Sequence, residues 1–349
     1  MIASHGRSPV TAADSELEML LGRMGLADEL AGRHLLITGG TGFFGRWLLA
    51  ALSRLNQQGN DISVTIASRD PARFLAMHPG YRDCAWLNWL AGDIRSLRAL
   101  PGRPADLILH AAADTSAAAQ ASPLELFDTL IEGARRVFDL AVSSRVERVL
   151  VTGSGAQYGA APDCGGISES YSGACASNAV ASAYGEGKRA QETLAALYAQ
   201  HHGLEVVMTR CFAFAGPGLP LDGHFAIGNF VRDALQSDEI VLNSSGEAVR
   251  SYLHGADLAV WLLTLLLRGA PGGAYNVGSD QAITIAELAQ RVVARIAPHK
   301  TLRILGHPDG AARSYYVPDI TRAKALGLDV WTSLDSSIDS MADWARGRR

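Results

Sequence analysis

A glycine-rich turn between an apolar run and a helical pattern, at residues 33–48, constrains the fold more than any other feature of the sequence. The apolar run at 35–37 follows polar residues, as expected of a buried parallel strand. Glycines follow with the spacing G-x-G-x-x-G over 40–45, and a helical pattern opens at Arg46. Such glycines form a tight turn, admit a pyrophosphate and pack helix on strand, while the helix N-terminus carries partial positive charge. The segment therefore predicts a dinucleotide site.

The composition limits the size of the fold and the kinds of partner that the chain can have. A chain of 349 residues is long enough for two lobes and a large core. The net charge of −4 gives no electrostatic reason to expect a nucleic acid or an anionic membrane as a partner. The four cysteines show neither C-x-x-C spacing nor a disulfide framework, which suits a reducing cytosol, and we expect no metal site.

Two segments bear on location. Residues 1–15 are mixed and polar and lack the apolar stretch of a signal peptide. The longest apolar run, at 258–267, is far shorter than the ~20 residues of a membrane span, so it predicts a buried helix. We therefore expect a soluble cytoplasmic protein.

The second predicted strand, at 62–67, ends at Ser68, Arg69 and Asp70. In a dinucleotide fold this end meets the adenosine ribose, where an acidic residue binds the 2′-hydroxyl and repels a 2′-phosphate. Ser68 and Arg69 offer a hydroxyl donor and a fixed cation, which suit a phosphate. This favours NADP over NAD, although Asp70 lies close enough to reverse the preference.

Two further strand ends add candidates. A loop after the strand near residue 90 brings Asp93 toward the adenine amino group. The strand at 105–110 ends at His110, and the small residues that follow it let the backbone lie close to a flat ligand. We interpret His110 as a packed strand-end residue rather than a catalyst.

A possible catalytic set comes from the next strand and helix. The strand at 146–152 is followed by Ser154, and ligands of open α/β sheets lie at such carboxyl ends. Tyr184 and Lys188 are four residues apart in a predicted helix, so their side chains share one face. A lysine ammonium near a phenol favours the phenolate and lowers its pKa toward the working pH.

These features occur in the order and spacing of the extended short-chain dehydrogenase/reductases, and the chain resembles their nucleotide-sugar epimerase and dehydratase branch over about residues 34–340. The segments that carry the resemblance are TGGTGFFG at 38–45, GDI at 92–94, TGSGAQYG at 152–159, YGEGK at 184–188, GEAVRSYLHGADLA at 246–259 and YNVG at 275–278.

The resemblance implies an α/β fold in which a doubly wound parallel-sheet Rossmann domain carries a smaller C-terminal α/β lobe. It implies an N-terminal helical extension at 1–32, a dinucleotide-binding domain at 33–210 to which 250–278 return, and a substrate lobe at 211–249 and 279–349. The residues expected to bind NADP or NAD are Gly39, Gly42, Phe43, Phe44, Gly45, Ser68, Arg69, Asp93, Ile94, Ala111, Ala112, Ala113, Tyr184 and Lys188.

The implied substrate is a nucleotide-diphosphate-sugar. Ser154 and Tyr184 would contact the reacting sugar hydroxyl, which makes Ser154, Tyr184 and Lys188 the implied catalytic residues. Asn229, Arg250 and Arg313 would bind the nucleotide and its diphosphate, while Ala213 stands where relatives often carry an asparagine. The family also implies a homodimer through a four-helix interface.

Three reactions share hydride transfer at a sugar carbon with Tyr184 moving the proton: epimerisation, keto-sugar reduction and dehydration. Sugar 4,6-dehydratases typically carry Asp-Glu where this chain has Gly155 and Ala156, neither of which carries a proton. Glu169 and Glu186 are conceivable substitutes. We therefore expect an epimerase or keto-sugar reductase, with a dehydratase or a non-catalytic dinucleotide-binding sensor or scaffold as alternatives.

Overall fold

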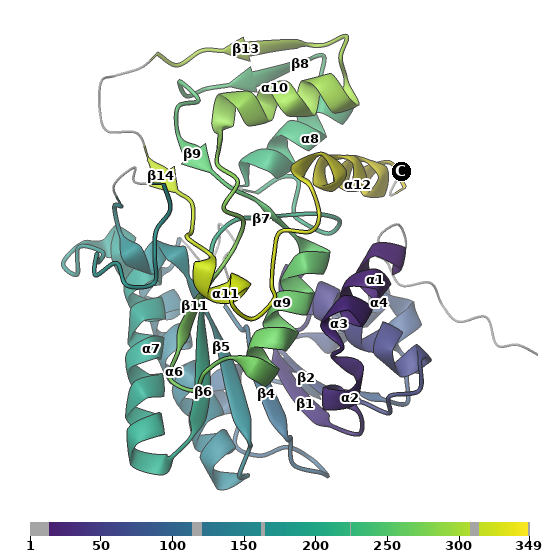
Figure 1. The fold of residues 1–349 in the computed structure, drawn as a ribbon, viewed down its shortest axis with the longest axis vertical. Coiled ribbons are helices and arrows are strands. Elements are labelled where there is room, and N and C mark those ends of the chain that lie inside the picture. Colours follow the sequence, from purple (N-terminus) through teal and green to yellow (C-terminus); the bar gives the residue numbers. More distant parts are fainter. Residues whose placement is uncertain (1–13, 114–120, 162–164, 224, 308–313, 348–349) are drawn as a thin grey trace, which may run out of the picture.

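The computed structural model describes residues 14–113, 121–161, 165–223, 225–307 and 314–347. In Figure 1 the lower part of the molecule is built around one sheet, and the upper part holds short strands and helices. The N-terminal helix lies at the side of the lower part.

Seven parallel strands form the central sheet, in the order β11-β6-β5-β4-β1-β2-β3. The strand order reverses between β1 and β4, which is where open α/β sheets bind ligands. This arrangement confirms the predicted doubly wound α/β fold. The strands are β1 (His34–Thr38), β2 (Ser63–Ser68), β3 (Leu87–Ala91), β4 (Leu107–His110), β5 (Arg148–Ser154), β6 (Glu205–Cys211) and β11 (Ala274–Val277).

Helices cover both faces of this sheet, which explains why its strands are apolar on both sides. Leu35 and Ile37 belong to one core with α3 and α9, whereas Leu36 belongs to another core with α6 and α7. The predicted buried helix at 258–267 is confirmed as part of α9, whose side chains are almost all buried. The helices are α3 (Phe43–Gln57), α6 (Pro123–Ser143), α7 (Ala183–His202) and α9 (Gly255–Arg268).

The upper part has its own apolar core between three helices and short strands. Its helices are α8 (Ala226–Gln236), α10 (Ile285–Ile296) and α12 (Leu334–Arg346). One small sheet pairs β8 (Glu239–Leu242) with β13 (Thr301–Ile304), and another has the order β12 (Ile283–Thr284), β9 (Val249–Arg250), β14 (Tyr315–Tyr316). A short pair, β7 (Phe214–Ala215) and β10 (Leu253–His254), lies between the two parts.

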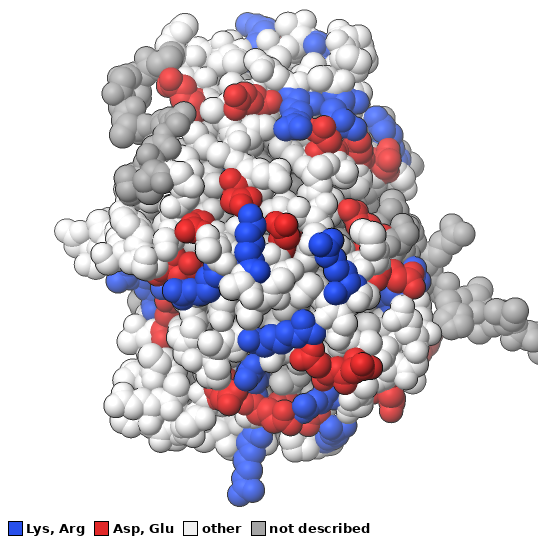
Figure 2. All heavy atoms as spheres, in the orientation of Figure 1, with Lys and Arg blue, Asp and Glu red and all other residues white. Residues whose placement is uncertain are grey.

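Short elements complete the described part of the chain, and none of its helices is long and apolar enough to cross a membrane. The face in Figure 2 mixes acidic and basic side chains, with no stripe of one sign. The remaining elements are α1 (Asp14–Met24), α2 (Ala27–Leu30), α4 (Pro71–Met77), α11 (Thr321–Lys324), η1 (Pro79–Tyr81), η2 (Ile94–Ser96), η3 (Gly155–Tyr158) and η4 (Val180–Ser182).

The N-terminal helix α1 is part of the main core rather than a loose appendage. Leu17, Leu20 and Leu21 are buried, and the helix packs against α9 and α3. A polar contact also holds α1: the Thr332 hydroxyl donates a hydrogen bond to the Glu16 carboxylate at 2.8 Å. The expected N-terminal helix is therefore present and packs against α9 and α3.

Replacing Leu20 by alanine should lower the free energy of unfolding by about 2–5 kcal/mol, because it removes a fully buried side chain and leaves a cavity. The neighbouring Met19→Ala is the control, since Met19 is 61% exposed and its loss should change stability by under about 0.5 kcal/mol. Urea unfolding of both variants checks this. Equal midpoints would mean that α1 adds nothing to the core.

Candidate functional site

The glycine-rich turn after β1 has the tight packing that a dinucleotide needs. A Cβ at Gly45 would lie 2.2 Å from the backbone of Gly40, so the start of α3 rests directly on the turn. Gly39 adopts a left-handed φ of 73°, and a Cβ there would lie 2.5 Å from the Ala111 carbonyl oxygen. Only glycine fits either position. The first N–H groups of α3, at Phe43 and Phe44, lack intrahelical acceptors and can bind phosphate oxygens.

The chain after β4 closes the other side of this turn. The Ala111 amide donates to the Thr38 carbonyl at 3.1 Å, and the Ala112 amide donates to the Thr38 hydroxyl at 3.2 Å. Residues 111–113 are partly exposed. The structure thus brings Ala111, Ala112 and Ala113 beside the glycine turn at the point where the strand order reverses.

At the end of β2, Arg69 and Asp70 have different neighbours. Asp70 is the N-cap of α4, and its carboxylate accepts a hydrogen bond from the Arg73 amide at 2.9 Å. Arg69 is exposed and is one of the cations that lower the pKa of Asp93. The hydroxyls of Ser68 and Thr41 lie 3.3 Å apart. Asp70 therefore already has a structural partner, which the sequence analysis did not predict.

Asp93 and Ile94 lie between β3 and α6. The Asp93 carboxylate accepts two bonds from the Arg95 guanidinium, at 3.0 and 2.8 Å, and this pairing lowers its pKa. Ile94 packs on α6, where a Cβ at Gly133 would lie 2.9 Å from its side chain. Asp93 is thus an ionised acceptor in a fixed position.

The predicted catalytic residues come together at the carboxyl end of β5. Ser154 ends the strand and is buried, and its hydroxyl accepts from the Ala156 amide at 3.2 Å. Lys188 is also buried; its Nζ donates to the Thr152 carbonyl at 2.6 Å, and burial lowers its pKa to about 8. Tyr184 lies one helical turn before it on α7, with Ser154 as an electrostatic neighbour.

The expectation that Lys188 lowers the pKa of Tyr184 is wrong in this structure. Burial raises the pKa of Tyr184 to about 12, and the Ser154 hydroxyl offsets only part of that rise. Lys188 is not among the groups that shift the pKa of Tyr184, and its Nζ hydrogen-bonds the β5 backbone instead. The phenol is therefore protonated near neutral pH.

His110 agrees with its interpretation as a packed residue. Its Nδ1 lies 2.7 Å from the Thr38 hydroxyl, and burial, with a contribution from Lys188, lowers its pKa to about 3. The ring is therefore neutral at physiological pH.

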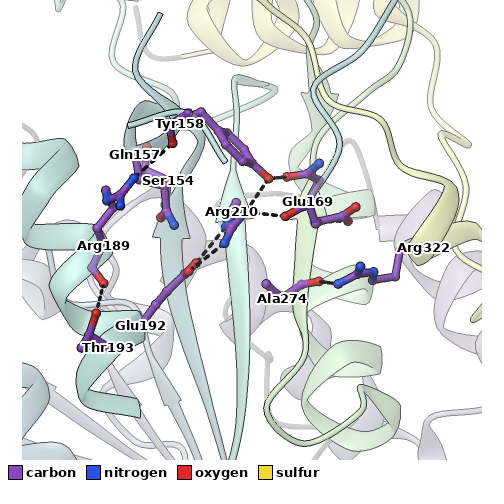
Figure 3. A network of polar contacts seen from close by, with 12 residues as sticks. Ser154, Gln157, Tyr158, Glu169, Arg189, Glu192, Thr193, Arg210, Ala274 and Arg322 are labelled. Atoms are coloured by element: carbon purple, nitrogen blue, oxygen red, sulfur yellow. Dashed lines mark hydrogen bonds and ion pairs between the residues drawn. The ribbon is translucent and has the colours of Figure 1, made fainter. Parts of the chain in front are cut away.

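A polar network around Arg210, on β6, includes Glu169, one of the two carboxylates named above as a conceivable substitute proton carrier. Arg210 binds Glu192 at 2.9 and 2.8 Å and donates to the Tyr158 hydroxyl at 2.9 Å (Figure 3). The Glu169 carboxylate accepts from the Asn276 backbone N–H at 2.8 Å, and the Glu169 carbonyl accepts from Arg210. Glu169 therefore serves to hold its segment against β11 and β6.

Two of the residues predicted to bind the nucleotide and its diphosphate, Asn229 and Arg250, lie in the upper part. Arg250, on β9, donates to the carbonyls of Val249 at 2.8 Å and Ser314 at 3.2 Å. Asn229 lies inside α8, which begins three residues earlier than the sequence suggested, and its side-chain amide donates to the Gly223 carbonyl at 3.0 Å. Arg313 lies outside the described residues.

Sequence reasoning missed Tyr316, which lies beside the catalytic candidates. A Cβ at Gly155 would lie 2.8 Å from the Tyr316 hydroxyl oxygen, and both Ser154 and Tyr184 affect its pKa, which burial raises. The pairing of β14 with β9 places Tyr316 opposite Arg250. The only available signal was two consecutive tyrosines after Arg313, and their distance along the chain from Ser154 hid the contact.

Known proteins resemble this chain in sequence and in structure. The family model described as NAD dependent epimerase/dehydratase family matches residues 35–278. UDP-glucuronic acid decarboxylase 6 of Arabidopsis thaliana is 28% identical over 317 residues, which are 89% of this chain and 88% of that protein.

Two solved structures share the fold. The UDP-glucose 4-epimerase of Thermotoga maritima, determined with UDP-glucose, has a TM-score of 0.75 at 20% identity, over 90% of this chain and 99% of that one. The dTDP-glucose 4,6-dehydratase DesIV of Streptomyces venezuelae, determined with NAD bound, has a TM-score of 0.76 at 24% identity, over 90% and 98%.

The fold, the glycine turn and the length of chain that the family model matches all indicate the same family. The family model covers more than two thirds of the chain, and the matched residues include the glycine turn, Ser154, Tyr184 and Lys188. The chain therefore belongs to the NAD-dependent epimerase/dehydratase family.

Proposed function

We propose that this protein is an NAD(P)-dependent nucleotide-diphosphate-sugar epimerase or keto-sugar reductase in which Tyr184 moves the proton of the reacting sugar hydroxyl. The observation that carries the proposal is the convergence of Ser154, Tyr184 and Lys188 at the end of β5, near the glycine turn at the switch point of the sheet. When bound, the nicotinamide supplies or accepts the hydride.

The protonation of Tyr184 suits the reductive direction. A pKa of about 12 keeps its phenol protonated near neutral pH, so it can donate a proton to a carbonyl oxygen as the carbon is reduced. Ser154, a pKa-lowering neighbour of that phenol, can bind the same oxygen. Lys188, buried and bonded to the β5 backbone, holds positive charge below pH 8 beside the site.

Elimination of water would need a further proton carrier, and the nearest positions do not supply one. Gly155 and Ala156 follow Ser154 directly and carry no ionisable group. Glu169 is bonded to Asn276, and Glu186 pairs with Arg189 at 3.8 Å. The proposal therefore favours epimerisation or reduction over the dehydration named for one structural neighbour.

For the cofactor we propose a preference for NADP(H). Arg69 is exposed at the end of β2, where the ribose of a bound dinucleotide lies. The competing residue, Asp70, already caps α4 and would lose that bond by turning to the ribose. Since cells keep NADPH reduced, this preference also favours a reductase.

A homodimer in the cytoplasm is part of the proposal. The predicted interface helices, α6 and α7, pack together and carry exposed apolar residues: Leu124 is 76% exposed and Leu197 is 44% exposed. A dimer formed through these helices would bury both side chains. Sedimentation at micromolar concentration would test it, and a monomer alone would contradict it.

The reaction itself can be tested with UDP- and dTDP-linked hexoses and their 4-keto derivatives, each with NAD and NADPH. A reductase consumes one NADPH per product, an epimerase changes the sugar without net cofactor turnover, and a dehydratase yields a product lighter by one water. Absorbance of the reduced cofactor and mass spectrometry distinguish the three. No change in any nucleotide-sugar would favour the sensor or scaffold alternative.

Tyr184→Phe should abolish turnover, by at least about a hundredfold, because phenylalanine keeps the ring and removes the proton carrier. Cofactor affinity, measured by fluorescence titration, should stay within about twofold. Tyr198→Phe, on the same helix, is the control, since its hydroxyl donates to Asp139 on α6. A Tyr184→Phe variant that keeps wild-type activity would place the proton carrier elsewhere.

Arg69→Ala should reduce the preference for NADPH over NADH by about tenfold, because it removes a charge-assisted bond to the 2′-phosphate. Isothermal titration with both cofactors measures the ratio. Arg73→Ala, which removes another exposed cation from the next helix, should leave the ratio unchanged. Tighter NAD binding by the wild type would overturn this assignment.

Arg250→Ala should raise the KM for the nucleotide-sugar roughly ten- to a hundredfold, because a guanidinium bond to a diphosphate contributes about 1.5–3 kcal/mol. Cofactor affinity should not change. Arg291→Ala provides the control, since Arg291 pairs with Asp335 on the exposed side of the same lobe. An unchanged KM would remove Arg250 from the substrate site.

A further inference from the structure

We propose that Glu16, Thr332 and Asp257 share one proton, and that this proton makes the packing of the N-terminal helix α1 on α9 dependent on pH. Glu16 lies on α1, Asp257 lies on α9, and Thr332 lies on the segment that joins α11 to α12. None of the three belongs to the candidate catalytic site, so this inference does not depend on the proposed function. It assigns a conformational role to the N-terminal extension.

The first support is a count of protons at the Thr332 hydroxyl. Its oxygen lies 2.6 Å from Oδ1 of Asp257 and 2.8 Å from Oε1 of Glu16, and both are hydrogen-bond distances. A hydroxyl carries one proton, and an ionised carboxylate carries none. Thr332 therefore donates to one carboxylate only. The second contact becomes a hydrogen bond when the other carboxyl carries a proton and donates it to Thr332.

The second support is the environment of Asp257. Its side chain is fully buried, and Thr332 is 2% exposed. Oδ2 of Asp257 accepts from the backbone N–H groups of Trp331 and Thr332, both at 3.0 Å. Despite these bonds, burial, with a contribution from the like charge of Glu16, raises the pKa of Asp257 to about 6. Asp257 is therefore the carboxyl that holds the shared proton in weak acid.

The third support is the way in which the neighbouring charges are already paired. Glu16 is the charged group of α1 that acts on Asp257. His254, at the N-cap of α9, is neutral in weak acid because burial lowers its pKa to about 4. Other charged groups on the described parts of the packed elements have partners elsewhere: Glu18 with Arg54, Arg23 with the Trp331 ring, Arg46 with the Gly218 carbonyl, Arg148 with Glu205, Arg268 with Glu29, and Asp329 with Lys324.

Loss of the shared proton should loosen α1. Once Asp257 and Glu16 are both charged, one contact to Thr332 lacks a hydrogen bond and the two like charges repel. When α1 opens, Asp257 regains water and its pKa returns toward its ordinary value of 3.8. The closed state therefore binds more protons than the opened state between that value and about pH 6. This contribution to stability is complete below the range and is lost as the pH rises through about 6.

Hydrogen exchange followed by mass spectrometry tests this on the full chain, from peptides that cover α1 at pH 5 and at pH 7.5. The opening constant of α1, corrected for the intrinsic exchange rate, should be about tenfold larger at pH 7.5. The reason is that opening in weak acid releases the shared proton, so acid opposes it. An opening constant that is equal at the two pH values would overturn the proposal.

Two variants of nearly unchanged shape separate proton sharing from packing. In Asp257→Asn the amide oxygen can accept from the two backbone N–H groups while the NH₂ group donates to Thr332, which then donates to Glu16. This variant imitates the protonated state and should keep the low opening constant at both pH values. In Glu16→Gln the new amide donates to Thr332, which donates to Asp257, so the change with pH should fall below about threefold.

Glu18→Gln is the matched control, because Glu18 lies on the same helix, is exposed and pairs with Arg54 at 3.0 Å. It should keep the tenfold change of the wild type. A tenfold change that persists in either Asp257→Asn or Glu16→Gln would contradict proton sharing. If Asp257→Asn does not fold, Glu16→Gln decides the question, since the Glu16 side chain is partly exposed.

Discussion

The contact of α3 with the glycine turn is the constraint on which the rest of the site depends. There is no room for a single carbon between Gly45 and Gly40, so the helix starts against the end of β1 and its first N–H groups face outward from the turn. The same helix contributes Trp47 and Leu48 to the largest core. Burial of its apolar face therefore holds in place the end of α3 that we propose binds phosphate.

The same helix also joins the two parts of the molecule. Arg46 donates to the Gly218 carbonyl, and Phe44 packs edge-on against Phe214 with ring centroids 4.9 Å apart. A Cβ at Gly255 would overlap the Trp47 ring at 2.0 Å, so α9 also lies directly against α3. Because one helix contacts the glycine turn, the segment after β6 and α9, the position of the upper part is linked to that of the cofactor turn.

The fold and the core of the site could be predicted from sequence because their signals are local. Apolar runs, the spacing of Gly42 and Gly45, and the four-residue separation of Tyr184 and Lys188 all lie within single elements. The N-cap role of Asp70 also has a local signal, the following Pro71, yet the ribose hypothesis competed with it. The pKa of Tyr184 could not be predicted, because burial depends on which segments cover the phenol.

The residues that sequence reasoning missed are those brought in by distant segments. Tyr316 reaches Gly155 across 161 positions of the chain because β14 pairs with β9, and both strands lie in the upper part, whose short strands give weak sequence patterns. The small size of Gly155 has two consequences at once: it removes a position where a proton carrier could stand, and it makes room for a phenol from elsewhere. The site therefore has, beside Ser154, a phenol whose pKa burial raises in place of an ionisable side chain at position 155.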